Sequence, residues 1–164
     1  MGIFTPTGYS KKYCLLHPWE VAAHKMRDIH CAWQRAVKGY CYRDVWNIDY
    51  WFLQTMPKMI DDLIKVHHGY PGEMTDKEWV ETLKKMSTAF KNANEETTEF
   101  INPYEDEYFE NVDFSFEDQK LICDVDEVLA DKYHNEEQKK IAFMQKSLDE
   151  GMTLFHKHFR GLWD

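Results

Sequence analysis

Apolar residues recur every three or four positions over several long stretches of the chain, and this spacing predicts amphipathic helices. The first helix is expected from Pro18, which suits a first helical position, to the stop signal Gly39. The apolar positions of this helix form one face: Trp19, Ala22, Met26, Ile29, Trp33 and Val37. Residues 1–16 are short and mixed, and we expect a strand or an extended arm there.

A second helix is predicted from Asp44, as its N-cap, to His67, before the stop signals Gly69 and Pro71. Its apolar arc is wide, which is typical of a central helix. Pro57 lies within the pattern and is expected to kink the helix.

Asp49 is the unusual residue of this second helix. At 100° per residue it projects from the middle of the apolar arc, so we predict a buried polar residue. A buried carboxylate needs a hydrogen-bond partner, or its pKa rises. The structural interpretation is a buried hydrogen bond, and the functional alternative is an acid that takes part in chemistry.

Two further helices are predicted from capping residues and from the spacing of apolar residues. Thr75 and Glu78 form a capping box at the start of the third, and Asn135 is a candidate cap for the last. Gly151 lies beside the apolar stripe of the last helix and is expected to let another helix approach closely. The stripe of the third helix is Trp79, Leu83, Met86 and Phe90, and that of the last is Ile141, Met144, Leu148, Met152, Phe155, Phe159 and Leu162.

Between these helices the pattern breaks. We expect an irregular, acidic and aromatic-rich insertion over 97–114, followed by a helix over 115–132 that begins at a capping box from Ser115 to Asp118. The predicted fold is therefore all-α: a four- to five-helix bundle in a single domain, 1–164, with one acidic insertion.

Net charge is −9, and it is concentrated in one segment. Residues 97–132 contain twelve acids against Lys120 and Lys132, a net −10, so the remainder of the chain sums to +1. A surface of this sign does not favour direct binding to nucleic acid, which needs basic residues.

The amino-acid composition indicates whether the chain is folded, secreted or embedded in a membrane. Hydrophobic residues make up 43% of the chain and aromatic residues 15%, which indicates a folded protein. The four cysteines form no C-x-x-C pair, and no secretory signal or membrane-spanning run is visible. We therefore expect reduced thiols, a cytoplasmic location and no contact with membranes.

The sequence gives little support to the interpretation of this chain as an enzyme. The sequence lacks G-x-G-x-x-G, P-loop and G-x-S-x-G patterns, and no cofactor is expected. The one alternative is a magnesium site at Asp124, Glu127 and Asp131, whose spacing resembles that of all-α nucleotide pyrophosphohydrolases. Glu95, Glu96 and Glu99 would be its partners, but the candidate ligands do not form the matching pair of E-x-x-E and E-x-x-D motifs of those enzymes.

The acidic insertion has three interpretations. It is a solvated loop, a binding face for a basic partner, or a mimic of nucleic-acid phosphates that occupies a basic groove. Aromatic residues among the acids favour recognition, since a solubilising segment does not need them. The predicted partner-binding residues are Tyr104, Glu105, Asp106, Glu107, Tyr108, Phe109 and Glu110.

Short blocks of the chain resemble a family of small proteins of tailed phages and prophages. These blocks include His17-Pro18-Trp19, Asp44-Val45-Trp46 with Asp49, His68-Gly69-Tyr70-Pro71, Trp79 and Leu162-Trp163-Asp164. The resemblance covers most of the chain except 94–134. It implies a viral gene product that acts in the bacterial cytoplasm, and it implies no activity and no functional residue.

These observations lead to one functional hypothesis and two alternatives. The leading hypothesis is a non-enzymatic phage accessory protein that binds a host protein with a basic surface, such as a defence nuclease, and inhibits it. The alternatives are a magnesium-dependent helical protein that binds or hydrolyses nucleotides, and a virion or assembly component.

Overall fold

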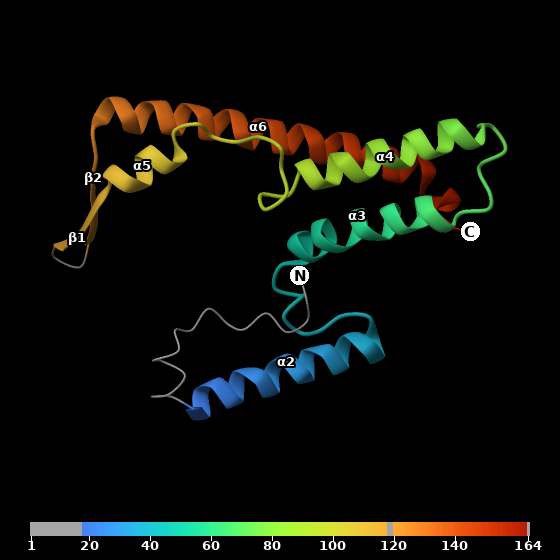
Figure 1. Cartoon of the computed structure of the whole chain (residues 1–164), viewed down its shortest axis with the longest axis horizontal. Helices are drawn as coiled ribbons and strands as arrows, with labels where there is room; N and C mark the ends of the chain where they lie inside the picture. The colour runs from blue at the N-terminus through green and yellow to red at the C-terminus, as the bar shows by residue number, and fades with distance from the viewer. Residues whose placement is uncertain (1–17, 118–119, 164) are drawn as a thin grey trace. The chain divides into compact units, whose positions relative to one another are not determined.

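The computed structural model of the protein describes residues 18–117 and 120–163 (Figure 1). Most of them are helical, which confirms the predicted all-α class, and an antiparallel hairpin is the exception. The strand or arm expected in 1–16 lies outside the described residues. The elements are α2 (Pro18–Lys38), α3 (Ile48–Val66), α4 (Asp76–Asn92), α5 (Glu105–Asn111), β1 (Asp113–Glu117), β2 (Lys120–Asp124), α6 (Glu127–His158) and the 3-10 turn η1 (Phe159–Gly161).

Two compact units make up the chain that we expected to form one domain. The first is Met1–Trp51 and the second is Phe52–Asp164, so the boundary falls near the start of α3. In the first unit, α2 has the predicted bounds, and Gly39 ends it with a φ of 82°. A positive φ at this position favours glycine, which explains why the helix stops there.

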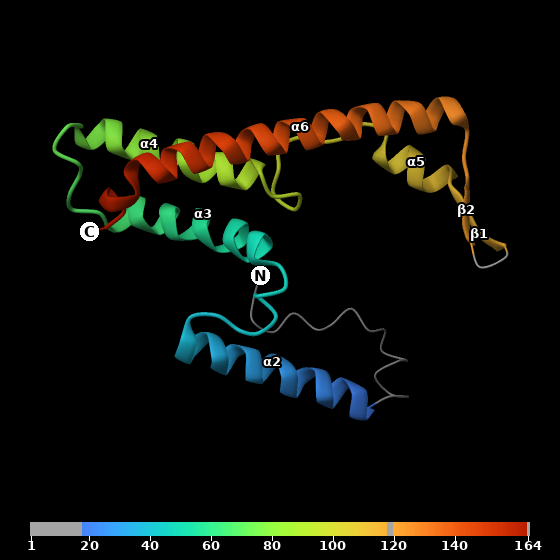
Figure 2. The same cartoon turned by 180° about the vertical axis from the view of Figure 1, so that it is seen from behind.

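The hydrophobic core of the second unit lies between α3, α4 and α6, which run alongside one another in both views (Figures 1 and 2). α4 supplies most of its fully buried side chains, in the predicted stripe, and begins at the predicted capping box of Thr75 and Glu78. The rings of Phe52, Phe90 and Phe155 meet edge to face at the centre, with centroids 5.1–6.1 Å apart. The buried members of the core are Ile60, Trp79, Leu83, Met86 and Phe90.

A polar contact also joins α3 to α4. Asp61 accepts hydrogen bonds from Ser87 Oγ at 2.6 Å and from Lys91 Nζ at 2.7 Å. Burial by itself raises the pKa of Asp61, but the hydrogen bonds from Lys91 and Ser87 outweigh it and lower the pKa. Because the charged carboxylate is satisfied by both partners, this contact fixes the register of the two helices.

α6 approaches α4 closely at Gly151, as the sequence predicted. A Cβ atom at Gly151 would lie 2.8 Å from two ring carbons of Phe90 and 3.4 Å from Cβ of Ala89. Phe90 is fully buried and cannot move aside cheaply, since the rings of Phe52 and Phe155 contact it. Only glycine fits at this point of the helix.

The prediction of a helix over 115–132 is wrong for the first half of that range. Residues 113–117 pair with 120–124 as the hairpin β1–β2, in a register that sets Ser115 opposite Ile122. Asp126 then caps α6 by accepting a hydrogen bond from the backbone N–H of Leu129 at 3.0 Å. α6 continues without a break through Asn135, the residue expected to start the last helix.

The acidic insertion is more regular than expected. We predicted an irregular segment over 97–114, but 105–111 form the helix α5. Three acids in its first turn stabilise it, because negative charges interact favourably with the N-terminal end of a helix dipole. The sequence suggested a loop because this helix is too short to show an apolar stripe.

Replacing Gly151 by Ala tests the close contact between α4 and α6. Alanine favours the helix by about 1 kcal/mol, but its Cβ collides with Phe90, and such overpacking costs about 1–3 kcal/mol. We expect a net loss of stability in urea and thermal unfolding. Gly72→Ala is the control, since a Cβ there meets nothing within 4 Å. Equal or greater stability of Gly151→Ala would show that the two helices are not packed this closely.

The connection between α3 and α4 contains a pH-sensitive contact. His67 Nε2 lies 3.0 Å from Asp76 Oδ1, and His67 Nδ1 lies 3.0 Å from the carbonyl oxygen of Ile64. Both partners are acceptors, so only the protonated imidazole donates to both. The hydrogen bond to Asp76 accordingly raises the pKa of His67, and the bond to Ile64 acts in the same direction.

This contact predicts a loss of stability as the pH rises. The stabilisation is complete below the unfolded pKa of about 6.5 and disappears as the pH passes the higher, folded pKa. In an NMR titration of the imidazole, Asp76→Asn is expected to bring the pKa of His67 down. Asp62→Asn is the matched control, because Asp62 pairs with Lys65 instead. A pKa of His67 that Asp76→Asn leaves unchanged would contradict this assignment.

Candidate functional site

The seven predicted partner-binding residues lie on and just before α5, which a buried asparagine joins to α6. Asn102 is 2% exposed, and its Nδ2 donates to the carbonyl oxygen of Tyr133 at 3.1 Å and to Oε2 of Glu137 at 3.3 Å. Its Oδ1 accepts from the backbone N–H of Tyr104 at 3.0 Å. One side chain therefore positions the start of α5 against the N-terminal half of α6.

Aromatic stacking makes the second connection between α5 and α6. The ring of Tyr108 lies parallel to that of Tyr133, with centroids 4.1 Å apart and an interplanar angle of 10°. Phe109 meets the same ring edge to face at 5.9 Å, and His134 meets Tyr108 at 5.8 Å. Burial raises the pKa of Tyr133, and the charge of Glu137 adds to the effect. Tyr133 is thus a neutral platform for α5.

The remaining side chains of α5 face solvent. Asp106, Glu107 and Glu110 are exposed, and Phe109 keeps 54% of its surface exposed despite its contact with Tyr133. Among the side chains that the structure describes, none forms an ion pair with these three acids. Positions 106, 109 and 110 are neighbours on one helical face, so an apolar ring lies among uncompensated charges.

The predicted set of residues therefore divides into two roles. Tyr104 and Tyr108 are half-buried; Lys132 Nζ lies 6.0 Å from the ring centre of Tyr104, and Tyr108 stacks on α6. Glu105 is also half-buried. Tyr104 and Tyr108 hold α5 against α6, and four exposed residues are available to a partner: Asp106, Glu107, Phe109 and Glu110. We call these four residues the α5 face.

Sequence reasoning missed the two residues that position the α5 face. Asn102 precedes Pro103, and an Asn-Pro pair is a turn signal that marks the position without revealing its long-range partners. No sequence feature marked Tyr133 as a contact of α5, because Tyr133 follows the segment that we treated as a separate helix. Both contacts cross 25 or more positions of the chain, from 102 to 133 and from 108 to 133.

The alternative magnesium site loses the geometry that suggested it. Asp124 ends β2 whereas Glu127 begins α6, so the three candidate ligands Asp124, Glu127 and Asp131 do not share one helical face. Of the expected partners, Glu99 accepts from Nδ2 of Asn92 and Glu96 accepts from Nε2 of Gln54. Among residues 18–112 and 125–163, whose side chains the structure describes, no group of three or more potential ligands is placed to hold a metal ion.

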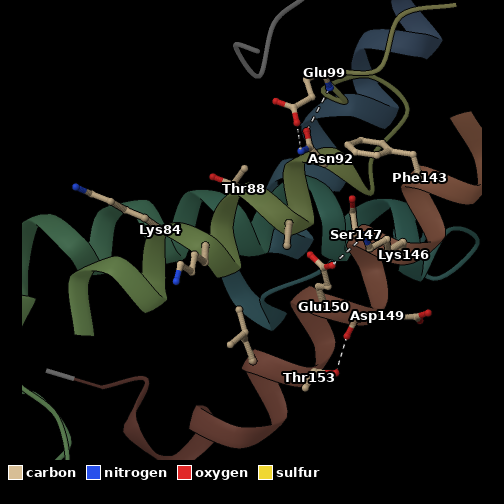
Figure 3. A pocket seen from close by; sticks show the side chains of 13 residues that line it. Lys84, Thr88, Asn92, Glu99, Phe143, Lys146, Ser147, Asp149, Glu150 and Thr153 are labelled. Carbon is tan, nitrogen blue, oxygen red and sulfur yellow. Dashed lines mark hydrogen bonds and ion pairs between the residues drawn. The ribbon is translucent and has the colours of Figure 1, made fainter. Parts of the chain in front are cut away.

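A groove of about 800 Å³ lies between α4 and α6 (Figure 3). Its rim carries lysines from both helices and the acids Glu99, Asp149 and Glu150. Several of these charges are engaged locally: Lys146 Nζ lies 3.9 Å from Glu150 Oε1, and Glu99 contacts Asn92. Ser147 is buried in the wall of the groove.

Three of the sequence blocks meet at the C-terminal end of α6. Gly161 lies where an added Cβ would be 3.2 Å from Pro71 and 3.8 Å from Trp79. Beside them is a hollow of about 690 Å³, lined in part by Tyr70, His158 and Trp163. Burial lowers the pKa of His158, whose ring lies 5.5 Å from that of Trp79. The blocks here join the α3–α4 connection to the chain's last turn, which is a structural role.

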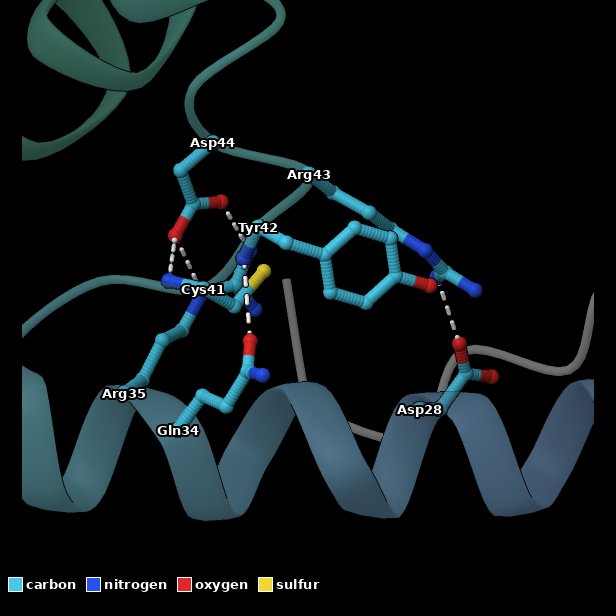
Figure 4. Close-up of polar contacts among 7 residues, drawn as sticks. All are labelled: Asp28, Gln34, Arg35, Cys41, Tyr42, Arg43 and Asp44. Atoms are coloured by element: carbon cyan, nitrogen blue, oxygen red, sulfur yellow. Dashed lines mark hydrogen bonds and ion pairs between the residues drawn. The ribbon is translucent and has the colours of Figure 1, made fainter.

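The structure corrects our expectation for Asp44. It is not the N-cap of α3, which begins at Ile48, but accepts hydrogen bonds from Arg35 Nε at 3.0 Å and from the backbone N–H of Cys41 at 2.7 Å (Figure 4). The guanidinium of Arg35 is the largest influence that lowers the pKa of Asp44. The turn after α2 is thereby folded back onto that helix.

The prediction of a buried Asp49 is also wrong. α3 begins at Ile48, so Asp49 is in its first turn, where the side chain is exposed and its charge favours the helix dipole. We placed it in the middle of an apolar arc because we started the helix three residues too early, at position 45. The apolar neighbours Val45, Trp46 and Ile48 are exposed as well.

Comparison with protein-family models, with curated proteins and with solved structures finds no match to this chain. None of the helices described in 18–117 and 120–163 is both long enough and apolar enough to cross a membrane. The geometry of the α5 face is accordingly the main support for a functional proposal.

Proposed function

We propose that this chain is a non-enzymatic binding protein whose α5 face recognises a basic surface on another protein. The single observation that carries the proposal is the placement of Phe109 among three exposed acids without described ion partners. An aromatic ring supplies a contact that a partner can desolvate, and the acids attract a basic surface.

The rigid attachment of α5 supports recognition over a solvated loop. A surface that is already ordered loses little conformational entropy when a partner binds. Asn102 and Tyr133 provide this order before any partner is present, through the buried hydrogen bonds and the stacked ring. A solubilising segment would not need either contact.

The charge also indicates the class of partner. Phosphate backbones are repelled by this face, so nucleic acid is not the direct partner. A basic groove that normally holds nucleic acid has the complementary charge, and a defence nuclease of a bacterial host is one protein with such a groove. The resemblance to tailed-phage proteins supports a host protein as the partner, and occupation of its groove would inhibit it.

Site-specific photo-cross-linking tests the proposal. Benzoylphenylalanine is placed at position 109 of the full chain, and at position 141 as the control, because Phe109 and Ile141 are 54% and 52% exposed. In bacterial lysate we expect a discrete cross-linked protein from position 109 only. Its yield should fall with added salt, since screening shortens the range of charge attraction to about 8 Å at 0.15 M and about 3 Å at 1 M.

Reversal of two charges on the α5 face, compared with reversal of two charges elsewhere, provides a matched pair of variants. Glu107→Lys with Glu110→Lys should reduce that product at least roughly tenfold, because attraction becomes repulsion. Glu73→Lys with Glu81→Lys changes the net charge equally on other exposed residues and should leave it intact. Equal labelling from position 141, or a product that survives reversal on α5, would contradict the proposal.

A further inference from the structure

Two cysteines meet where the chain turns back after α2. Cys31 is on the helix and Cys41 is in the turn, and their thiols lie within hydrogen-bonding distance of one another. Neither forms a disulfide. Both belong to the first unit, so their contact depends only on α2 and on the turn that follows it. Residues 32–40 separate them, a spacing that matches no cysteine motif.

Glycine at position 39 allows the chain to turn back along α2. Gly39 has a φ of 82°, a left-handed conformation that glycine adopts without strain. Positions 28, 31 and 35 of α2 follow one another at steps of 3 and 4, so they share one face of the helix. The returning segment contacts this face before and after position 31 (Figure 4).

Two charged contacts fix the returning segment on either side of Cys31. Arg43 Nη1 donates to Asp28 Oδ1 at 2.8 Å, about one helical turn before Cys31. Arg35 Nε donates to Asp44 Oδ2 at 3.0 Å, about one turn after it. The segment is therefore held over the part of α2 that carries the cysteine.

The backbone of Cys41 is held by the same turn. Oδ2 of Asp44 accepts the N–H of Cys41 at 2.7 Å, and the N–H of Asp44 donates to the carbonyl oxygen of Cys41 at 3.0 Å. The next N–H, that of Tyr42, donates to Gln34 Oε1 at 3.0 Å. Because its backbone is fixed at these points, Cys41 keeps its side chain beside that of Cys31.

Two thiols in this arrangement need little movement to form a disulfide. An S–S bond is about 2.05 Å long and joins Cβ atoms that are about 3.5–4.5 Å apart. Hydrogen-bonded thiols already direct their sulfur atoms toward each other, so small rotations of the side chains complete the approach. Groups held in contact also react far faster than the same groups free in solution.

The surroundings of Cys31 influence how the pair is oxidised. Burial raises the pKa of the Cys31 thiol, and the hydrogen bond with Cys41 adds to this effect. The charges of Arg43 and Arg35 act in the opposite direction. Since the thiolate is the reactive form, we expect a slow first oxidation, followed by a fast step between sulfur atoms in contact. The disulfide then forms before a second oxidant molecule produces sulfinic acid.

We propose that Cys31 and Cys41 are a modification site at which a peroxide converts two thiols into a reversible disulfide. One sulfur attacks a peroxide oxygen: an S–O bond forms, the O–O bond breaks, and water leaves with the proton of that thiol. The other sulfur then attacks the first: the S–S bond forms, the S–O bond breaks, and a second water leaves with the remaining proton. The thiols lose two electrons and hydrogen peroxide gains them, and a dithiol reductant restores both thiols.

The disulfide would attach the turn covalently to α2. It closes a ring through residues 32–40, so local opening no longer separates the turn from the helix. We expect the amide protons of Cys41 and Tyr42 to exchange at least about tenfold more slowly in the oxidised protein. This effect is independent of the α5 face.

Peptide mapping of the full chain tests the proposal. The wild type is treated with excess hydrogen peroxide, its remaining thiols are alkylated, and it is digested without reduction by trypsin, which cuts after Arg27, Arg35, Lys38 and Arg43. We expect peptide 28–35 joined to peptide 39–43, and separation of the two by dithiothreitol. Cys14→Ser with Cys123→Ser should form the same disulfide, with an intact mass lower by two hydrogen atoms.

An equilibrium measurement tests whether the turn positions the pair. In buffers of reduced and oxidised glutathione, the fraction of disulfide gives the effective concentration of one thiol at the other. Asp44→Ala removes the contact that holds Cys41 and should lower this concentration at least about tenfold. Asp49→Ala, which removes an equal charge from the first turn of α3, is the control and should leave it unchanged.

Three results would overturn the proposal. The first is a wild type in which Cys31 and Cys41 stay reduced, or become sulfinic acids, under peroxide. The second is a disulfide that joins either of them to Cys14, to Cys123 or to another copy of the chain. The third is an effective concentration that Asp44→Ala and Asp49→Ala change equally, because the turn would then not hold the thiols together.

Discussion

The close contact between α6 and α4 at Gly151 is the constraint on which the second unit depends. Because no side chain separates the helices there, Phe90 fills the space between α3, α4 and α6, and the aromatic core forms around it. α6 has 32 residues, about 48 Å at 1.5 Å per residue, so it is far longer than α4, with 17. Its C-terminal half builds the core, and its N-terminal half holds α5.

This division of α6 gives the acidic segment its character. The charge is attached to a framework by one buried amide, Asn102, and one stacked ring, Tyr133. A short helix such as α5, with seven residues, is not stable by itself in water, so its conformation depends on these two contacts. The acids are then displayed at fixed positions, which is what recognition by charge and shape requires.

Much of the fold follows from local sequence, and the errors have physical causes. Capping at Thr75 and the stop at Gly39 are local features and are confirmed, and so is the close approach of another helix at Gly151. Asp44 was misplaced because Arg35, nine positions earlier in the chain, engages its carboxylate. The hairpin was missed although Phe114 and Phe116 alternate with polar residues over 113–117 in a way that favours a strand.

The candidate site could be predicted only in part, because its residues were visible but its supports were not. Hydrogen exchange of α5 in the wild type and in Asn102→Ala tests the central claim, that buried contacts to α6 order the acidic face. We predict measurable protection of the amides of 108–111 in the wild type and its loss in Asn102→Ala, with the amides of α4 unaffected. Exchange of α5 at the rate of an unfolded chain in the wild type would contradict the account.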